Sequence, residues 1–127
     1  ACLGVLPGDD VDCRIMENTL YKVLKEWDLK KKSWGWDFPM IAMTATRLGK
    51  PDIAISILLN DLPQNRFLAN GHNSTREDLP CYLPANGALL TAVALMAAGW
   101  EGEQTVEAPG FPKDGNWSVQ HEGIMKY

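Results

Sequence analysis

Two stretches of the chain are apolar on nearly every side, which is the pattern of a helix buried among other helices. They are Phe38–Leu48 and Asn86–Ala98. A helix that covers a core keeps one polar face, so the near absence of polar positions predicts that these two helices lie inside the fold. A long loop rich in aromatic, amide, imidazole and carboxylate side chains precedes each of them. These two loops are where we expect function.

Two further segments have the polar and apolar faces of outer helices. After Asp12, which is suited to cap a helix, apolar residues recur at helical spacing, at Met16, Leu20, Val23, Leu24 and Trp27. Gly49 is placed to end the first buried helix and Pro51 to begin a third helix, after a turn so short that the two must form an antiparallel hairpin. The apolar stripe of this third helix contains Ile53, Ala54, Ile57 and Leu58.

The order of outer and inner helices predicts an all-α fold of antiparallel helical hairpins in two layers. Both long loops then lie at one end and enter the N-termini of inner helices, where free N–H groups and the helix dipole favour carboxylates and anionic ligands. We expect residues 1–99 to form the helical part and residues 100–127 an extended C-terminal arm that lies on the helices. Within the arm, Trp117–Glu122 has the alternation of a short strand.

Composition and charge narrow the class of protein. The 127 residues, 46% of them hydrophobic, suffice for one compact domain. The net charge of −4 and a single basic run, Lys30–Lys32, argue against nucleic-acid binding, and no apolar run is long enough to span a membrane. The three cysteines and two histidines lack metal-ligand spacing, so we expect no metal and no cofactor. The chain begins at Ala1 without an initiator Met or a signal-peptide pattern, which suggests a processed protein or an excised piece.

The first loop offers aromatic rings beside a carboxylate. In an extended loop Trp34 and Trp36 would point to the same side and present flat faces of the kind that pack on sugar rings; the alternative is that they close the end of the core. Asp37 is suited to bind a sugar or to act in catalysis, but its place before Pro39 is also that of a helix cap.

The second loop combines amide, imidazole and charged groups. Asn70, His72 and Asn73 supply donors and acceptors suited to vicinal hydroxyls, although Gly71 also marks a plain turn. The charged residues that follow, Arg76, Glu77 and Asp78, are either a solvated cluster or part of a site. The length of this loop favours function over a spacer.

Four motifs carry a family resemblance. They are Trp34–Met40, Arg47–Pro51, Asn70–Asn73 and Leu83–Leu90. Together they resemble the last part of the catalytic domain of bacterial glycoside hydrolase-like proteins, similar to families 65 and 95. The resemblance implies an (α/α)6 barrel, a toroid of six helical hairpins, of which this chain would be a C-terminal fragment.

The resemblance also implies inverting chemistry, in which a carboxylic acid protonates the leaving group and an opposed base activates water or phosphate. The general acid would lie upstream of these residues. Family 95 has an acidic residue just before the last inner helix, where this chain reads Leu83–Asn86, so the base is missing from its usual place. Glu77 and Asp78 are the candidates to replace it.

We therefore expect the C-terminal part of a carbohydrate-active enzyme, inactive when isolated, that binds sugar through Trp34, Trp36, Asp37, Asn70, His72, Asn73 and Arg76. The alternatives are a small helical protein-interaction module and a non-catalytic sugar-binding remnant. The chain is expected to be soluble; its location is not readable from the sequence, and the bacterial periplasm and secretion are the options considered. When isolated it is expected to self-associate, because only the other barrel helices would cover the apolar faces of its two inner helices.

Overall fold

The computed structural model describes residues 1–102 and 106–126, and within them the chain is all-α. Its helices are α1 (Cys13–Glu26), α2 (Asp37–Arg47), α3 (Pro51–Leu58) and α4 (Leu83–Ala98), with a 3-10 turn η1 (Pro63–Asn65). The described residues contain no strand, and β-type pairing is limited to two isolated bridges. The prediction of an all-α fold is confirmed, and none of the described helices has both the length and the apolar character needed to cross a membrane.

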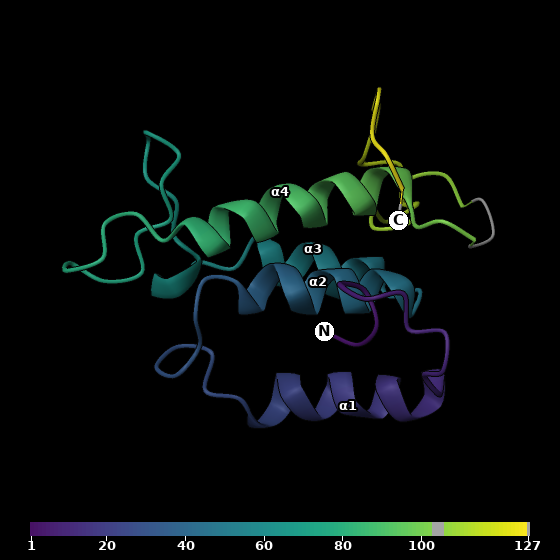
Figure 1. Cartoon of the computed structure of the whole chain (residues 1–127), viewed down its shortest axis with the longest axis horizontal. Helices are drawn as coiled ribbons and strands as arrows, with labels where there is room; N and C mark the ends of the chain where they lie inside the picture. Colours follow the sequence, from purple (N-terminus) through teal and green to yellow (C-terminus); the bar gives the residue numbers. More distant parts are fainter. Residues whose placement is uncertain (103–105, 127) are drawn as a thin grey trace.

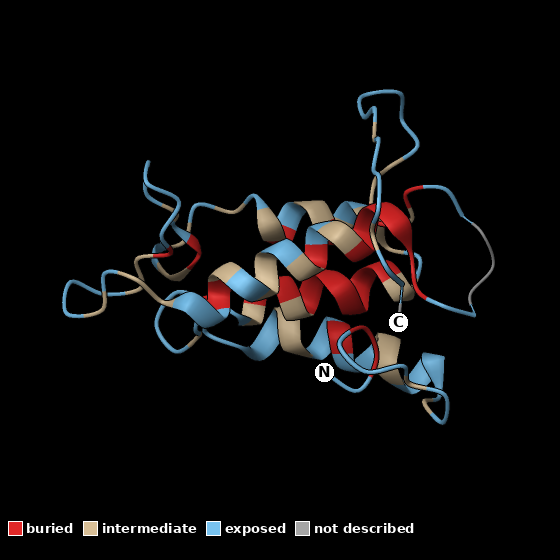
Figure 2. Ribbon diagram, turned by 45° about the horizontal axis from the view of Figure 1, so that its top comes forward, coloured by how far each residue is buried: buried red, intermediate tan, exposed pale blue. Residues whose placement is uncertain are grey.

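Helix α2 lies at the centre of the molecule, with α1 on one side and α3 and α4 on the other (Figure 1). Eight of its eleven residues are buried, and Phe38, Ala42 and Ala45 are wholly inaccessible to solvent. Figure 2 shows this concentration of buried residues in α2 and in the C-terminal half of α4. The expectation that α2 would expose an apolar face is wrong, because the other helices of this chain already surround it.

Helix α4 is buried on one side only. Ala85, Ala92, Leu95 and Met96 face the core, whereas Leu90 is 72% and Leu83 67% exposed. The helix begins at Leu83, three residues before the apolar stretch that predicts it, because Pro84 in the first turn has no N–H that needs a helical partner. For α4, the expectation of an uncovered apolar face is correct.

Helix α1 is the outer, amphipathic helix. The Asp12 side chain accepts hydrogen bonds from the N–H groups of Arg14 and Ile15, at 2.9 and 3.0 Å, so the predicted N-cap is confirmed. Of the predicted apolar stripe only Leu20 is fully buried, and Trp27 is exposed. An apolar cavity of about 570 Å³ between α1, α2 and the N-terminal segment accounts for this loose packing.

Both terminal segments attach where α2 and α4 end. The carbonyl of Leu3 accepts from the Thr44 hydroxyl at 2.7 Å, and the buried Trp100 indole donates to the Gly4 carbonyl at 2.8 Å. In the C-terminal arm, the Gly110 N–H donates to the carbonyl of Met96 in α4. The alternating segment at 117–122 is irregular rather than a strand, since no other described segment pairs with it.

The two long loops, residues 27–36 and 59–82, lie at the end of the molecule where α2 and α4 begin (Figure 1). This follows from the hairpin between α2 and α3, in which Gly49 takes a positive φ of 67° and returns the chain in the opposite direction. The antiparallel hairpin is confirmed. The loops that carry the candidate residues are therefore neighbours in space.

Candidate functional site

The first loop ends in a tight turn that Asp37 closes. The Asp37 carboxylate accepts a hydrogen bond from the Trp34 N–H at 2.7 Å, and the Asp37 N–H donates to the Trp34 carbonyl at 3.0 Å. Asp37 is thus the first residue of α2, and the cap position falls on Trp36, which makes no side-chain cap bond. The expected Asp37 cap and the expected extended Trp34–Trp36 geometry are both wrong, because the carboxylate binds the turn instead.

Gly35 lets this turn press against the second loop. A Cβ at Gly35 would stand 2.5 Å from Asn73 Oδ1 and 2.6 Å from the Cβ of Ala85 in α4, so only glycine fits there. The first loop, the second loop and the start of α4 therefore meet at one point. Trp34 and Trp36, on either side of Gly35, are both exposed at the surface.

Asn73 holds the second loop together from inside. Its side chain is fully buried and bonds three groups: the carbonyls of Gln64 and Arg66, at 3.1 and 3.2 Å, and the hydroxyl of Thr75, at 2.9 Å. Its main chain is bonded as well, to Asn86 Oδ1 and to the Tyr82 N–H. Since Asn73 has no accessible surface, we assign it a structural role and leave it out of the sugar-binding residues.

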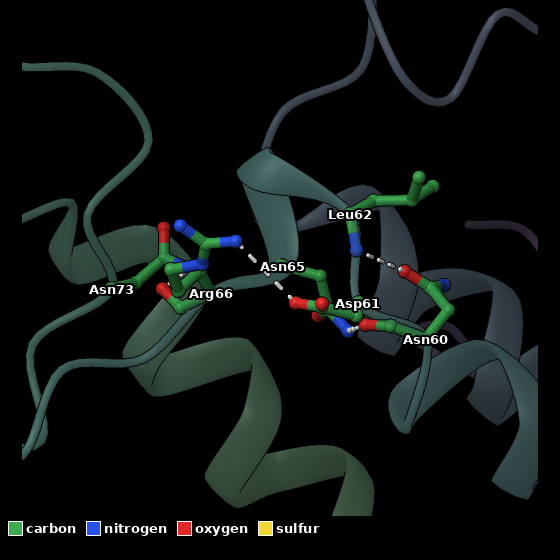
Figure 3. Close-up of polar contacts among 6 residues, drawn as sticks. All are labelled: Asn60, Asp61, Leu62, Asn65, Arg66 and Asn73. Carbon is green, nitrogen blue, oxygen red and sulfur yellow. Dashed lines mark hydrogen bonds and ion pairs between the residues drawn. The ribbon is translucent and has the colours of Figure 1, made fainter.

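Figure 3 shows how the second loop leaves α3. Asn65 Nδ2 donates to the carbonyls of Leu58 and Asn60, at 2.8 and 3.0 Å, and Asn60 Oδ1 accepts from the Leu62 N–H at 3.2 Å. An exposed ion pair between Arg66 and Asp61 adds little to stability. Sequence reasoning missed Asn60 and Asn65, whose only signal is the preference of asparagine for turns.

Asn70 and His72 form the tip of the second loop. Asn70 Oδ1 accepts from the His72 N–H at 3.0 Å, and Asn86 Nδ2 donates to the Gly71 carbonyl at 2.6 Å, which ties the tip to α4. The side chains of Asn70 and His72 are exposed. They remain available to a ligand, and the hydrogen bond from Asn86 limits how far the tip can move.

Trp34 joins the two loops through its ring. Its indole lies 5.4 Å from the Tyr82 ring, centroid to centroid, and the Arg76 guanidinium lies 5.8 Å from the Trp34 centroid. Arg76 in turn donates two hydrogen bonds to the Asp78 carboxylate, at 3.0 and 3.2 Å. The structure thus brings Trp34, Arg76 and Asp78 together, whereas Glu77 is exposed and makes no contact of this kind with a described residue.

Tyr82 is the site residue that sequence reasoning overlooked. Tyr82 is the residue just before α4, as Trp36 is the residue just before α2. This equivalent position of two aromatic residues was the sequence signal that could have identified Tyr82. Burial raises the pKa of the Tyr82 phenol, and the charge of Asp37 raises it further. Asp37 and Tyr82 therefore belong to one electrostatic environment.

The Asp37 carboxyl is half-buried at this junction. Burial raises its pKa above the ordinary value of 3.8, and the hydrogen bond from Trp34 only partly opposes that effect. A carboxyl in such surroundings holds a proton more readily than one in water, which is the property that a proton donor requires.

This raised pKa makes stability depend on pH. The folded chain favours the protonated form of Asp37, so the stability due to this group is fully present below pH 3.8 and declines as the pH rises through the higher folded-state pKa. Asp37→Asn abolishes that decline. Urea unfolding between pH 3 and pH 7 should show the variant gaining stability relative to the wild type as the pH increases; parallel curves would contradict the assignment.

Two cavities open at this face. One, of about 340 Å³, is lined by the acidic residues Glu26, Asp28 and Asp37 and by Lys32. The other, of about 150 Å³, is lined by Trp34, Arg76 and basic residues of the first loop. Within residues 1–102 and 106–126, no three His, Cys, Asp or Glu side chains converge as a metal ion would require. The larger cavity is suited to hydroxyl groups, for which carboxylates are strong acceptors.

Comparison of the chain with family models, with curated proteins and with solved structures gives no match.

Proposed function

We propose that this chain is the C-terminal part of a carbohydrate-active enzyme of the (α/α)6 type and supplies a sugar-binding face where α2 and α4 begin. One observation carries the proposal. The two candidate loops form a single surface, since Trp34 contacts Tyr82 and Arg76 of the second loop and Gly35 contacts Asn73. The motif resemblance to families 65 and 95 adds the substrate class and the larger barrel.

Trp36 is the residue best placed to stack on a sugar. Its side chain is 51% exposed, and among the described residues no aromatic ring or cation packs on it. Trp34, by contrast, is already in contact with Tyr82 and Arg76. Sugar sites pair such apolar ring faces with a few fixed polar groups, which here are Asp37 and the carboxylates of the larger cavity.

The chain is proposed to bind rather than to complete a reaction. Both oxygens of Asp78 accept hydrogen bonds from Arg76, and Glu77 is solvated, so neither stands in the half-buried setting that raises the pKa of Asp37. Glu77 and Asp78 stay the proposed substitutes for the missing base, and the principal acid is proposed to lie in another part of the protein.

Trp36→Ala is expected to weaken saccharide binding about tenfold or more, because loss of a stacking platform removes at least about 1.4 kcal/mol. The measurement is binding to a glycan array, followed by calorimetry on the glycans retained. Trp117→Ala is the matched control, since Trp117 is also exposed but lies in the C-terminal arm. Equal losses for the two variants, or no loss for Trp36→Ala, would contradict the proposal.

The exposed face of α4 favours a second candidate, a helical module that binds protein. Leu83, Leu90 and Val93 lie on one side of α4 and are exposed. In the barrel proposal the next barrel helix covers this face. In the module proposal a separate protein covers it.

Leu90→Glu is expected to reduce self-association of the isolated chain, since a charge on the contact face has to be desolvated there. Light scattering over a concentration series measures this, and a wild-type chain that is monomeric throughout would overturn the expectation.

The length of the encoding reading frame separates the two candidate functions, the barrel fragment and the protein-binding module. A frame several times longer than 127 codons agrees with a barrel, whereas one that ends near these termini favours the module.

A further inference from the structure

The smaller cavity of the proposed sugar-binding face is positively charged. Lys31, Lys32 and Arg76 line it beside the indole of Trp34, and no carboxylate is part of its wall. The larger cavity next to it contains three carboxylates. Lys32 and Ser33 line both cavities, so the two are adjacent and differ sharply in charge.

The two lysines are held in place by their backbone while their charged groups stay unpaired. The Asp28 carbonyl accepts from the Lys32 N–H at 2.8 Å, and the Asp28 carboxylate accepts from the Lys31 N–H at 3.2 Å. Within the described part of the chain, neither ammonium group forms an ion pair or a hydrogen bond. Arg76 shares its charge with Asp78, so the unneutralised charge of the cavity comes from the lysines.

Gln64 connects the second loop to the same cavity. Its Nε2 donates to the Lys30 carbonyl at 2.9 Å, which joins the second loop to the lysine turn. Its Oε1 is buried and, among the described residues, has no donor. The Nε2 bond fixes the Gln64 side chain in the wall of the cavity, between the second loop and the lysine turn.

We propose that the saccharide bound at this face is acidic, with a carboxylate or sulfate group in the smaller cavity and neutral hydroxyl groups in the larger one. This inference rests on the proposed sugar-binding function and names its substrate class. Lys31 and Lys32 bind the anionic group, and the carboxylates of Asp28 and Asp37 accept hydrogen bonds from the neutral part. An uncharged sugar would leave both ammonium groups without a counter-charge.

The test is an array that displays neutral, uronic-acid and sulfated oligosaccharides, probed with the wild type and with the double variant Lys31→Gln/Lys32→Gln. The wild type should retain acidic glycans, with affinity that falls at least tenfold in the double variant and declines as salt rises from about 0.05 to 0.5 M. The double variant Lys22→Gln/Lys25→Gln removes the same charge from two exposed positions of α1 and should leave binding unchanged. Uronic-acid and sulfated probes distinguish the two kinds of anion.

The same experiment distinguishes failure of the acidic specificity from failure of the sugar-binding function. Equal retention of neutral and acidic glycans, both lost with Trp36→Ala, would overturn the acidic specificity and leave the sugar-binding function in place. Retention of no saccharide would overturn both. If inorganic sulfate alone bound as tightly as every acidic glycan, the cavity would be a site for simple anions and the saccharide inference would fail.

Discussion

Replacing Asn73 with alanine is expected to lower the free energy of unfolding by about 2–4 kcal/mol, as removal of a buried polar group that serves several partners does. The substitution deletes the three part-buried side-chain hydrogen bonds to Gln64, Arg66 and Thr75; of these partners, only the Arg66 carbonyl keeps another bond within the described residues, from the Ser74 N–H. It also leaves a void at a position with no accessible surface. Urea unfolding followed by far-UV circular dichroism measures the loss.

The matched control is Asn70→Ala, at the exposed tip of the same loop. Asn70 makes only local contacts with His72, so its replacement should change stability by less than about 0.5 kcal/mol. If Asn73→Ala were as mild as Asn70→Ala, the buried network would not be what orders the second loop. Saccharide binding should also be lost in Asn73→Ala, because Arg76 and Tyr82 depend on that loop.

Gly35→Ala is expected to have the second large effect, a loss of about 1–3 kcal/mol in stability together with separation of the two loops. The new Cβ would lie within 2.6 Å of both Asn73 and Ala85, and neither neighbour is the flexible end of a long side chain. The turn must therefore move outward, which draws Trp34 away from Tyr82. Loss of near-UV circular dichroism from that ring pair, measured beside urea unfolding, would report the separation.

Gly87→Ala provides the control for this prediction. Gly87 lies in α4 with open space around its Cβ position, and alanine at such a helical site stabilises by about 0.5–1 kcal/mol. The two variants add the same methyl group and should change stability in opposite directions. Two changes of the same sign would show that Gly35 is not a point of close contact.

The helices were predictable where the signal was local. Asp12 caps α1 and Gly49 turns the chain between α2 and α3, because each acts on backbone groups within a few residues. The start of α4 was also within reach, since Pro84 marks a first turn, but the apolar pattern begins only at Asn86. Periodicity locates the interior of a helix better than its ends.

The site was harder to predict because its contacts join separate segments. The Asp37 carboxylate could accept either from the free N–H groups at the start of α2 or from the Trp34 N–H. Both kinds of donor lie within a few residues of Asp37, so sequence spacing does not show which of them it binds. The burial of Asn73 follows from the packing of Gly35 and Ala85 around it, which no periodicity encodes. Residue type alone made Asn73 look like a sugar ligand.

The most direct test of the sugar-binding face is an NMR titration of the indole N–H groups with the saccharides retained on the array. The chain has five tryptophans, each with its own signal. We predict shifts for Trp34 and Trp36, with Trp117 and the buried Trp100 unchanged. Shifts confined to Trp117, or none with any saccharide, would contradict the account.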